Sequence, residues 1–378
     1  MSHVVLLGAQ PRSMVNFRGE LIRAIVAAGH KVTAMTADAT ADEIQSLKEF
    51  GAEYRSFPVQ RNGLNPVRDV ITWFALRRAF REVKPDVVLA YTIKPIIWGG
   101  LAARGLRGVR FFALVTGLGF AFQDGGPARL VLRALVTFLY RLGLARAAGV
   151  VFQNTDSAEL FVARGIVPVR KVSVTAGSGV DLQHFAQMPL PTGNPVFLTI
   201  SRLLGEKGLR EYAEAAHLVR ASHPEAEFWL VGPEDPSPDG IPLSEVVGWQ
   251  ERGWVKYHGE TLDVRPMLAS CSIFVLPSYH EGMPRAVLEA LAVGRPIITT
   301  DVPGCRETVV PNENGFLAPS GDSHALVERM NWFLANPKAW ERMGLRSRAM
   351  AEARFDVRLV NEQLIREMGL KRSEGSSF

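Results

Sequence analysis

Two carboxylates flank the start of a predicted helix in the second half of the chain. Glu281 lies in a short loop after an apolar, β-branched run typical of a buried strand, and Glu289 follows in a segment of helix-forming composition. Their eight-residue separation spans roughly 12 Å at the helical rise, about the length of a sugar joined to a ribose through a diphosphate. The helix N-terminus between them is suited to bind the diphosphate. One carboxylate could then bind the sugar hydroxyls and the other the ribose diol. A capped amphipathic helix with two surface glutamates fits the same spacing, so spacing alone leaves both interpretations open.

Two cations precede this stretch. Arg202 and Lys207 flank a turn between a predicted strand, 196–201, and a helix that begins near Leu209. Cations at the start of a helix are suited to a diphosphate. Basic residues are common near turns, so this pair alone does not define a site.

The elements that must position these residues alternate between strand and helix. At 378 residues the chain is long enough for two domains. Alternation of strands and helices predicts a parallel sheet covered on both faces. The predicted strands of the first half are 4–7, 31–35, 87–91, 111–115, 149–152 and 172–174, with a loop at 8–19 that leads into a helix ending at 28 and a further helix at 67–83. We expect a first domain at 1–188, a linker at 189–195, a second domain at 196–355, and a segment at 356–378 formed by a helix that crosses back to the first domain and a disordered tail.

Several classes of protein are disfavoured by composition. Two cysteines are too few for a disulfide framework, and a reducing compartment is expected. The N-terminus reads as a first strand rather than a signal peptide, and no apolar run is long enough to span a membrane. The first loop lacks the Gly-x-Gly-x-x-Gly fingerprint of dinucleotide enzymes. No Asp-x-Asp triplet occurs, so a metal clamp is not indicated.

Charge is distributed unevenly along the chain. Residues 1–180 contain 23 Lys and Arg against 12 Asp and Glu, a net charge of +11, whereas residues 181–378 contain 20 against 26, a net charge of −6. The apolar segment 128–147 carries four arginines, at 129, 133, 141 and 146. This pattern, with the positive charge of the first half, predicts peripheral contact with an anionic membrane surface through segment 128–147. A core helix with a polar edge is the alternative.

The stretch from Pro277 to Ala292, together with 294–298 and 314–317, resembles the donor-site signature of retaining glycosyltransferase family 4. The resemblance covers nearly the whole chain and is strongest over 196–320 and 91–119. Thr-Ile-Lys-Pro at 92–95 and Thr-Gly-Leu-Gly at 116–119 resemble a bacterial branch that adds sugars to undecaprenyl-diphosphate-linked glycans for capsule, O-antigen or protein glycosylation. The resemblance to the family implies the α/β GT-B fold, in which two Rossmann-like parallel-sheet domains face a cleft.

The resemblance also implies roles for individual residues. Catalytic roles fall on Glu281, Lys207 and Arg202. Donor-binding roles fall on Gly282, Met283, Pro284, Glu289, Gly8 and Gly259, with the nucleobase near 255–259. Acceptor or cleft roles fall on Arg12, Asn16, Arg18, Lys94 and Thr116, although each of the three near the first helix could equally be a surface residue at a helix start. Many family members have a cleft histidine near 116–119. This chain has none there, which leaves the contact to the distal sugar hydroxyl unassigned.

The implied activity is retaining, metal-independent transfer of a hexosyl or N-acetylhexosaminyl group. The donor is expected to be a UDP-sugar, and the acceptor a polyprenyl-diphosphate-linked saccharide at the inner face of the bacterial cytoplasmic membrane. Neither a cofactor nor a nucleic-acid partner is expected. Two alternatives remain open: a non-hydrolysing UDP-sugar 2-epimerase of the same fold, and a non-catalytic subunit that binds a sugar nucleotide.

Overall fold

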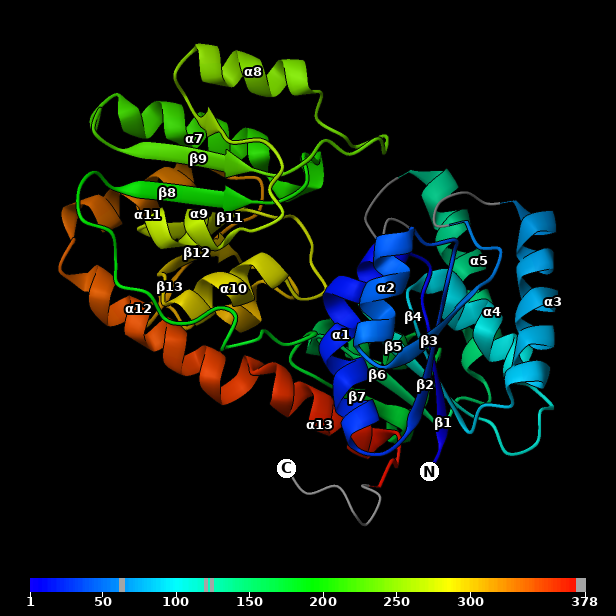
Figure 1. Ribbon diagram of the computed structural model, residues 1–378. Helices are drawn as coiled ribbons and strands as arrows, with labels where there is room; N and C mark the ends of the chain where they lie inside the picture. The colour runs from blue at the N-terminus through cyan, green and yellow to red at the C-terminus, as the bar shows by residue number, and fades with distance from the viewer. Residues whose placement is uncertain (61–64, 119–121, 123–125, 372–378) are drawn as a thin grey trace. The chain divides into compact units, whose positions relative to one another are not determined.

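The chain forms two compact units, each built on one parallel sheet (Figure 1). The computed structural model describes residues 1–60, 65–118, 122 and 126–371. Gly119 of the Thr-Gly-Leu-Gly motif and the expected tail from 372 therefore lie outside the described residues. The first unit comprises Met1–Ser178 and the residues from Arg358 onward, and the second comprises Gly179–Val357.

The boundary after Ser178 falls before the linker expected at 189–195. Residues 179–188 belong to the second unit because their backbone bonds to it. The N–H of Val180 donates to the carbonyl of Phe355 at 2.7 Å, and the N–H of Met188 donates to the carbonyl of Val293 at 3.1 Å.

The first unit holds a seven-stranded sheet in the order β3-β2-β1-β4-β5-β6-β7. Its strands are β1 (His3–Leu7), β2 (Lys31–Thr36), β3 (Ala52–Ser56), β4 (Val87–Tyr91), β5 (Arg110–Val115), β6 (Gly149–Phe152) and β7 (Val172–Val174). β4, β6 and β7 have the predicted bounds, whereas β3 was not predicted. β3 lies at the sheet edge, and its Glu53-Tyr54-Arg55 sequence lacks the apolar run of a buried strand.

Helices cover both faces of this sheet, as its alternating sequence predicts. α1 (Pro11–Ala27) and α2 (Ala41–Glu49) lie on one side, while α3 (Pro66–Val83), α4 (Ile93–Ala103) and α5 (Pro127–Leu144) lie on the other (Figure 1). α6 (Thr155–Ala163) joins β6 to β7. The loop predicted at 8–19 is mostly helix, because α1 begins at Pro11, where the missing proline N–H costs nothing.

The last helix, α13 (Val357–Glu367), completes the core of the first unit. Val360, Leu364 and Met368 are buried against residues of β1, α1 and β4. The side chain of Arg110 in β5 donates to the carbonyl of Met368 at 2.8 Å. The first unit is thus assembled from the two ends of the described chain.

The second unit holds a six-stranded parallel sheet in the order β10-β9-β8-β11-β12-β13. Its strands are β8 (Val196–Ile200), β9 (Glu227–Val231), β10 (Lys256–Tyr257), β11 (Ile273–Leu276), β12 (Ile297–Thr300) and β13 (Gly315–Ala318). Its α-helices are α7 (Leu209–Arg220), α8 (Leu243–Glu251), α9 (Arg265–Ser270), α10 (Arg285–Val293), α11 (Ser323–Ala335) and α12 (Ala339–Met350). The helix predicted from Leu209 begins at that residue.

A fully buried arginine joins the elements of the second unit. Arg295, between α10 and β12, donates to the backbone carbonyls of Leu268 at 2.9 Å, Met188 at 3.1 Å and Pro189 at 2.9 Å. A fourth bond goes to the carbonyl of Ala269 at 3.3 Å. Burial lowers the pKa of Arg295. Its planar guanidinium satisfies carbonyls that would otherwise be buried without donors.

Replacing Arg295 should therefore destabilise the protein. We expect Arg295→Met to lower the free energy of unfolding by roughly 2–4 kcal/mol, because it strands several buried carbonyls. Urea unfolding followed by tryptophan fluorescence measures this. Arg346→Met is the matched control, since Arg346 pairs with Glu313 at an exposed site and should change stability by less than about 1 kcal/mol. Equal losses in the two variants would contradict the role given to Arg295.

Candidate functional site

Three loops meet at one edge of the second sheet. They follow β8, β11 and β12, and parallel strands bring their carboxyl ends to the same edge. Gly208 has a φ of +67°, and a Cβ there would lie 2.1 Å from the carbonyl oxygen of Pro277. Gly304 has a φ of +82°, and a Cβ there would lie 2.6 Å from the carbonyl oxygen of Gly282. Backbone therefore contacts backbone directly between these loops, which fixes their spacing.

A lysine and a glutamate form an ion pair where the first two loops meet. Lys207 Nζ lies 2.7 Å from Glu281 Oε1, and the two side chains are only 12% and 16% exposed. The buried hydroxyl of Ser278 also donates to Glu281 Oε1, at 2.9 Å. Burial lowers the pKa of Lys207, but the adjacent Glu281 carboxylate outweighs burial, and the pKa is raised overall. Lys207 is therefore a cation at neutral pH.

Arg202 supplies a second positive charge close to Lys207. Arg202 forms an ion pair with Asp235, four residues after the end of β9, and the charge of Arg202 acts against protonation of Lys207. Burial raises the pKa of Asp235, but bonds from Ser237 and Arg202 outweigh it, so that the pKa is lowered overall. The structure thus brings Arg202, Lys207 and Glu281 together within one unit.

Glu289 lies on α10, the helix that follows the loop after β11. It is largely buried and accepts a hydrogen bond from Arg285 Nε at 2.8 Å, one helical turn earlier. Burial raises the pKa of Glu289, with Arg285 acting in the opposite direction. Gly282 and Met283 lie in the preceding loop, and Pro284 is the N-cap of α10. Pro284 has an extended backbone, so the helix begins one residue later.

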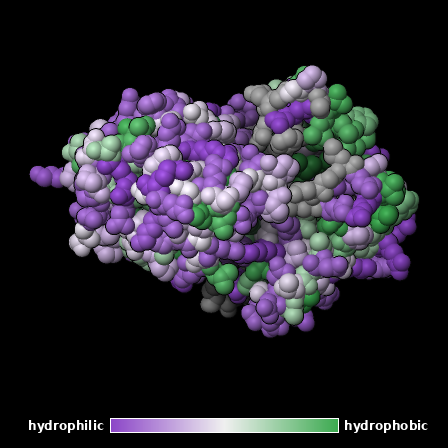
Figure 2. Space-filling model, turned by 90° about the horizontal axis from the view of Figure 1, so that it is seen from above, coloured by the Kyte–Doolittle hydropathy of each residue, from purple (hydrophilic) through white to green (hydrophobic). Residues whose placement is uncertain are grey.

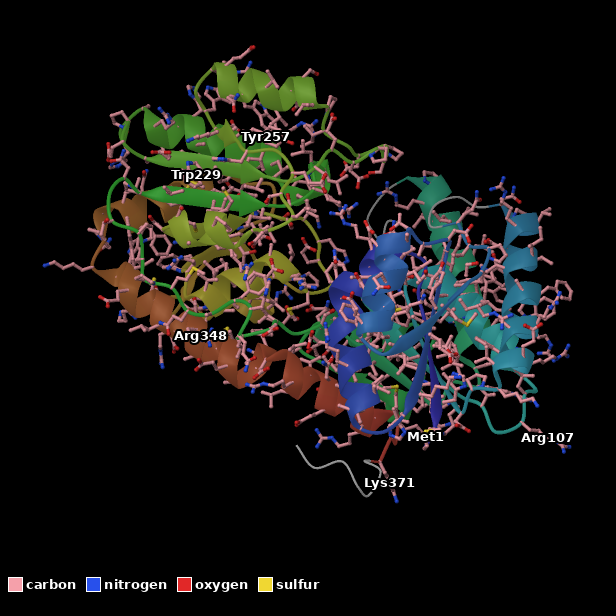
Figure 3. All side chains as sticks on the ribbon, in the orientation of Figure 1. Met1, Arg107, Trp229, Tyr257, Arg348 and Lys371 are labelled. Carbon is pink, nitrogen blue, oxygen red and sulfur yellow. The ribbon has the colours of Figure 1, made fainter. Side chains whose placement is uncertain are left out.

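The predicted nucleobase region, 255–259, includes β10, an outermost strand of this sheet, with β9 between it and β8. β10 covers only two residues of this region, and Figure 3 shows its Tyr257 and the neighbouring Trp229 of β9. The carbonyl of Gly259 accepts a bond from the N–H of Gly232 at 2.8 Å. The hydroxyl of Tyr257 donates to the carbonyl of Gly232 at the same distance. Gly259 thus lies beside the carboxyl end of β9.

The remaining predicted residues belong to the first unit. Gly8 follows β1 and touches Tyr91, because a Cβ there would come within 2.3 Å of the ring. Arg12 and Asn16 are exposed on α1, one turn apart. Arg18 is buried, lies over the Tyr91 ring and donates to Ser178 Oγ at 3.1 Å. These contacts give Arg18 a structural role inside the first unit.

Lys94 and Thr116 lie near the carboxyl ends of β4 and β5. Lys94 Nζ forms an ion pair with Asp69 Oδ1 of α3 at 2.8 Å, and both side chains are largely buried. Thr116 directly follows β5 and is half-buried. Asp69 is the partner that a lysine in an apolar segment requires.

Sequence reasoning did not identify the partners Asp69, Asp235, Ser278 and Arg285. Only Arg285 carried a usable signal, because a residue four before Glu289 on a helix shares its face. Within the described residues, no cluster of three or more His, Cys, Asp or Glu side chains could hold a metal ion.

Two family models match the chain. The model described as "Glycosyl transferase 4-like domain" matches residues 14–177, and "Glycosyl transferases group 1" matches residues 194–336. The second match contains Arg202, Lys207, Glu281 and Glu289.

Known proteins resemble the chain over most of its length. It is 28% identical to the N,N'-diacetylbacillosaminyl-diphospho-undecaprenol alpha-1,3-N-acetylgalactosaminyltransferase of Campylobacter jejuni, over 94% of this chain and 95% of that protein. It is 27% identical to the UDP-Gal:alpha-D-GlcNAc-diphosphoundecaprenol alpha-1,3-galactosyltransferase of Escherichia coli, over 72% of each. Sucrose-phosphate synthase from Thermosynechococcus elongatus shares the fold with a TM-score of 0.77 at 19% identity, over 97% of this chain and 98% of that one. The predicted family and fold class are confirmed: the chain is a glycosyltransferase, with a glycosyl transferase 4-like domain and a glycosyl transferases group 1 domain in the two Rossmann-like sheets of a GT-B protein.

Proposed function

We propose that this glycosyltransferase moves a hexosyl or N-acetylhexosaminyl group from a UDP-sugar to a saccharide carried on a polyprenyl diphosphate. The transfer retains the anomeric configuration and uses no metal ion. The observation that carries the proposal is the pair of buried charges, Lys207 and Glu281, beside Arg202 at the start of two helices.

The second unit supplies the donor site in this proposal. Lys207, Arg202 and the N–H groups of Gly282 and Met283 bind the diphosphate. Glu281 orients the transferred sugar and Glu289 holds the ribose diol. Arg202 and Lys207 both have carboxylate partners, so the diphosphate must share or replace Asp235 and Glu281 as their counter-ions. Such an exchange places the donor without burying uncompensated charge.

The chemical step requires stabilisation of a leaving group rather than a covalent intermediate. The bond between the anomeric carbon and the phosphate oxygen breaks, and positive charge develops on the sugar ring. Both electrons of the bond leave with UDP, whose new charge the two cations stabilise. The acceptor hydroxyl forms the new bond on the same face, and the departing phosphate oxygen takes its proton. The donor's own phosphate thus serves as the base.

The acceptor class is proposed from relatives that align along the chain. The two relatives described above are named for transfer to undecaprenyl-diphosphate-linked sugars, and the second is named for a UDP-linked donor. A lipid-linked acceptor implies work at a membrane, and we propose peripheral attachment to an anionic surface on the cytoplasmic side. Among the described residues, no helix has the length and apolar character needed to cross a bilayer.

A donor and acceptor panel tests the activity directly. UDP-glucose, UDP-galactose and their N-acetylated forms, with GDP-mannose for comparison, are each incubated with undecaprenyl-diphosphate-linked mono- and disaccharides. We expect UDP release that depends on both substrates and survives EDTA, and a product whose anomeric configuration by NMR matches the donor. Inversion, or loss of activity in EDTA, would contradict the mechanism. Acceptor-independent conversion of the UDP-sugar would indicate a 2-epimerase, and donor binding without release a non-catalytic subunit; no finding here favours either.

Removing Lys207 should reduce activity without unfolding the protein. We expect Lys207→Ala to lower kcat/KM at least roughly tenfold, about 1.4 kcal/mol of lost leaving-group stabilisation. Lys338→Ala, at an exposed position of the same unit, should retain full activity. Circular dichroism checks that the variants are folded. Normal turnover in Lys207→Ala would refute this donor site.

Glu289→Gln should separate function from stability. A carboxyl group whose pKa is raised by folding binds its proton more tightly in the folded chain. The free energy of unfolding therefore falls as the pH rises above the ordinary value of 4.5 towards the folded pKa, and this cost persists at neutral pH. The amide removes the cost, so we expect unchanged or greater stability at neutral pH together with at least roughly tenfold lower activity.

Urea unfolding at mildly acidic and at neutral pH, paired with UDP release, measures both effects. Glu251→Gln, at an exposed position of α8, is the control and should change neither. Loss of stability in parallel with activity would assign Glu289 a structural role instead.

A further inference from the structure

Two helices of the first unit expose large apolar side chains to solvent. On α3 these are Val67, Val70, Ile71 and Phe74, and on α5 they are Leu130, Val131, Leu135 and Phe138. Phe74 and Phe138 are 58% and 55% exposed. The exposed apolar residues recur at helical spacing, over 67–74 in the first half of α3 and over 130–138 in the first two-thirds of α5. Exposed arginines lie among them on α3, at 68, and towards the C-terminal ends, at 78 and 81 on α3 and at 141 on α5.

The exposed apolar parts of the two helices lie towards the same edge of the first sheet. α3 ends just before β4 begins, and α5 ends just before β6 begins, so both helices run antiparallel to the parallel strands. Their N-terminal halves therefore lie towards the carboxyl ends of the strands. α4 packs between them, and the Lys94–Asp69 ion pair ties its first turn to that of α3. Figure 2 shows hydrophobic side chains gathered in two groups over α5 and α3.

The charge of these helices identifies the partner. Together they carry seven arginines against Asp69 and Glu82, a net charge of +5. Both acidic residues are paired, Asp69 with Lys94 and Glu82 with Arg55 and Arg78. An apolar surface with arginines alongside matches a lipid leaflet with anionic headgroups, where apolar side chains enter the acyl boundary and guanidinium groups bind phosphates.

We propose that the exposed apolar parts of α3 (67–74) and α5 (130–138) form one membrane-docking surface, which we call the α3–α5 surface, and that it inserts into an anionic leaflet. The sequence predicts membrane contact for segment 128–147 alone, most of which is α5. The structure adds α3 to this contact. The inference rests on the proposed function in one respect, that a lipid-linked acceptor would reach the enzyme at this leaflet. Lys94 and Thr116 lie at the carboxyl ends of strands of the same sheet, the edge at which the α3–α5 surface begins.

Vesicle binding by the full chain tests the proposal. The variants are Ile71→Ser/Phe74→Ser on α3 and Leu135→Ser/Phe138→Ser on α5. Val169→Ser is the matched control, because Val169 is 72% exposed in the same unit but lies outside both helices. Each protein is sedimented with vesicles of equal parts phosphatidylglycerol and phosphatidylcholine, and separately with phosphatidylcholine alone.

We expect the wild type and Val169→Ser to bind the anionic vesicles, and to bind them less well in high salt. Each double variant should lose at least roughly tenfold in partitioning, since two large apolar side chains leave the lipid contact. Undiminished binding by the α3 variant would overturn its half of the surface, and absence of wild-type binding would overturn the whole. A wild-type dimer that the variants convert to monomers, seen by light scattering, would instead assign the surface to a second copy.

A transfer assay with a detergent-soluble, short-chain acceptor, which needs no vesicle, tests the proposed function separately from membrane docking. Both double variants should transfer sugar to it at the wild-type rate, because none of the four residues belongs to the donor site. Transfer without vesicle binding would leave the function standing and end the docking proposal. Vesicle binding that the double variants lose, without transfer from any donor, would support the docking proposal and contradict the proposed function.

Discussion

A buried pair of opposite charges at the edge of the second sheet is the constraint on which the rest of this unit depends. Lys207 and Glu281 lie 74 residues apart in sequence and 2.7 Å apart in space. Neither charge could stay away from water without the other, because the desolvation of an unpaired ion costs several kcal/mol. Their loops must therefore hold a fixed spacing. The close contacts of Gly208 with Pro277 and of Gly304 with Gly282 provide it without help from side chains.

In the proposed donor site, the cations are already held by ion pairs within the protein. Arg202 pairs with Asp235, Lys207 with Glu281 and Arg285 with Glu289, so each of these cations has a carboxylate counter-ion. The positions of the cations are thus set by protein contacts. In the proposed reaction the donor enters a preorganised field, and little reorganisation remains for the chemical step.

Much of the fold could be predicted from the sequence because buried parallel strands leave a strong local signal. β4, β6 and β7 are short apolar runs between helical segments, and their bounds were predicted to the residue. β3 was missed because an edge strand needs no apolar run. The predicted loop at 8–19 failed because Pro11 begins a helix rather than preventing one.

The candidate site could also be predicted only in part, because residues close in sequence were found and their distant partners were missed. The cations and carboxylates of the second unit were found because each pair is local: Arg202 and Lys207 flank one turn, and Glu281 and Glu289 lie in one loop and the helix after it. Their partners were not, since Asp235 lies 33 residues from Arg202 and Asp69 lies 25 residues from Lys94. The burial of Arg18 could not be predicted either, because its contacts, Tyr91 of β4 and Ser178, are distant in sequence. Tertiary pairing of this kind has no periodicity in sequence.

The docking of α13 has a consequence for how the protein is made. Val360, Leu364 and Met368 close a core whose other walls are β1, α1 and β4, so the first unit contains residues from near both ends of the chain. The residues of the second unit, 179–357, are translated between the two parts of the first unit. The ribosome must therefore synthesise the whole of the second unit and then α13 before residues 1–178 can cover their last apolar face, and until then those residues remain a nascent intermediate that chaperones can bind.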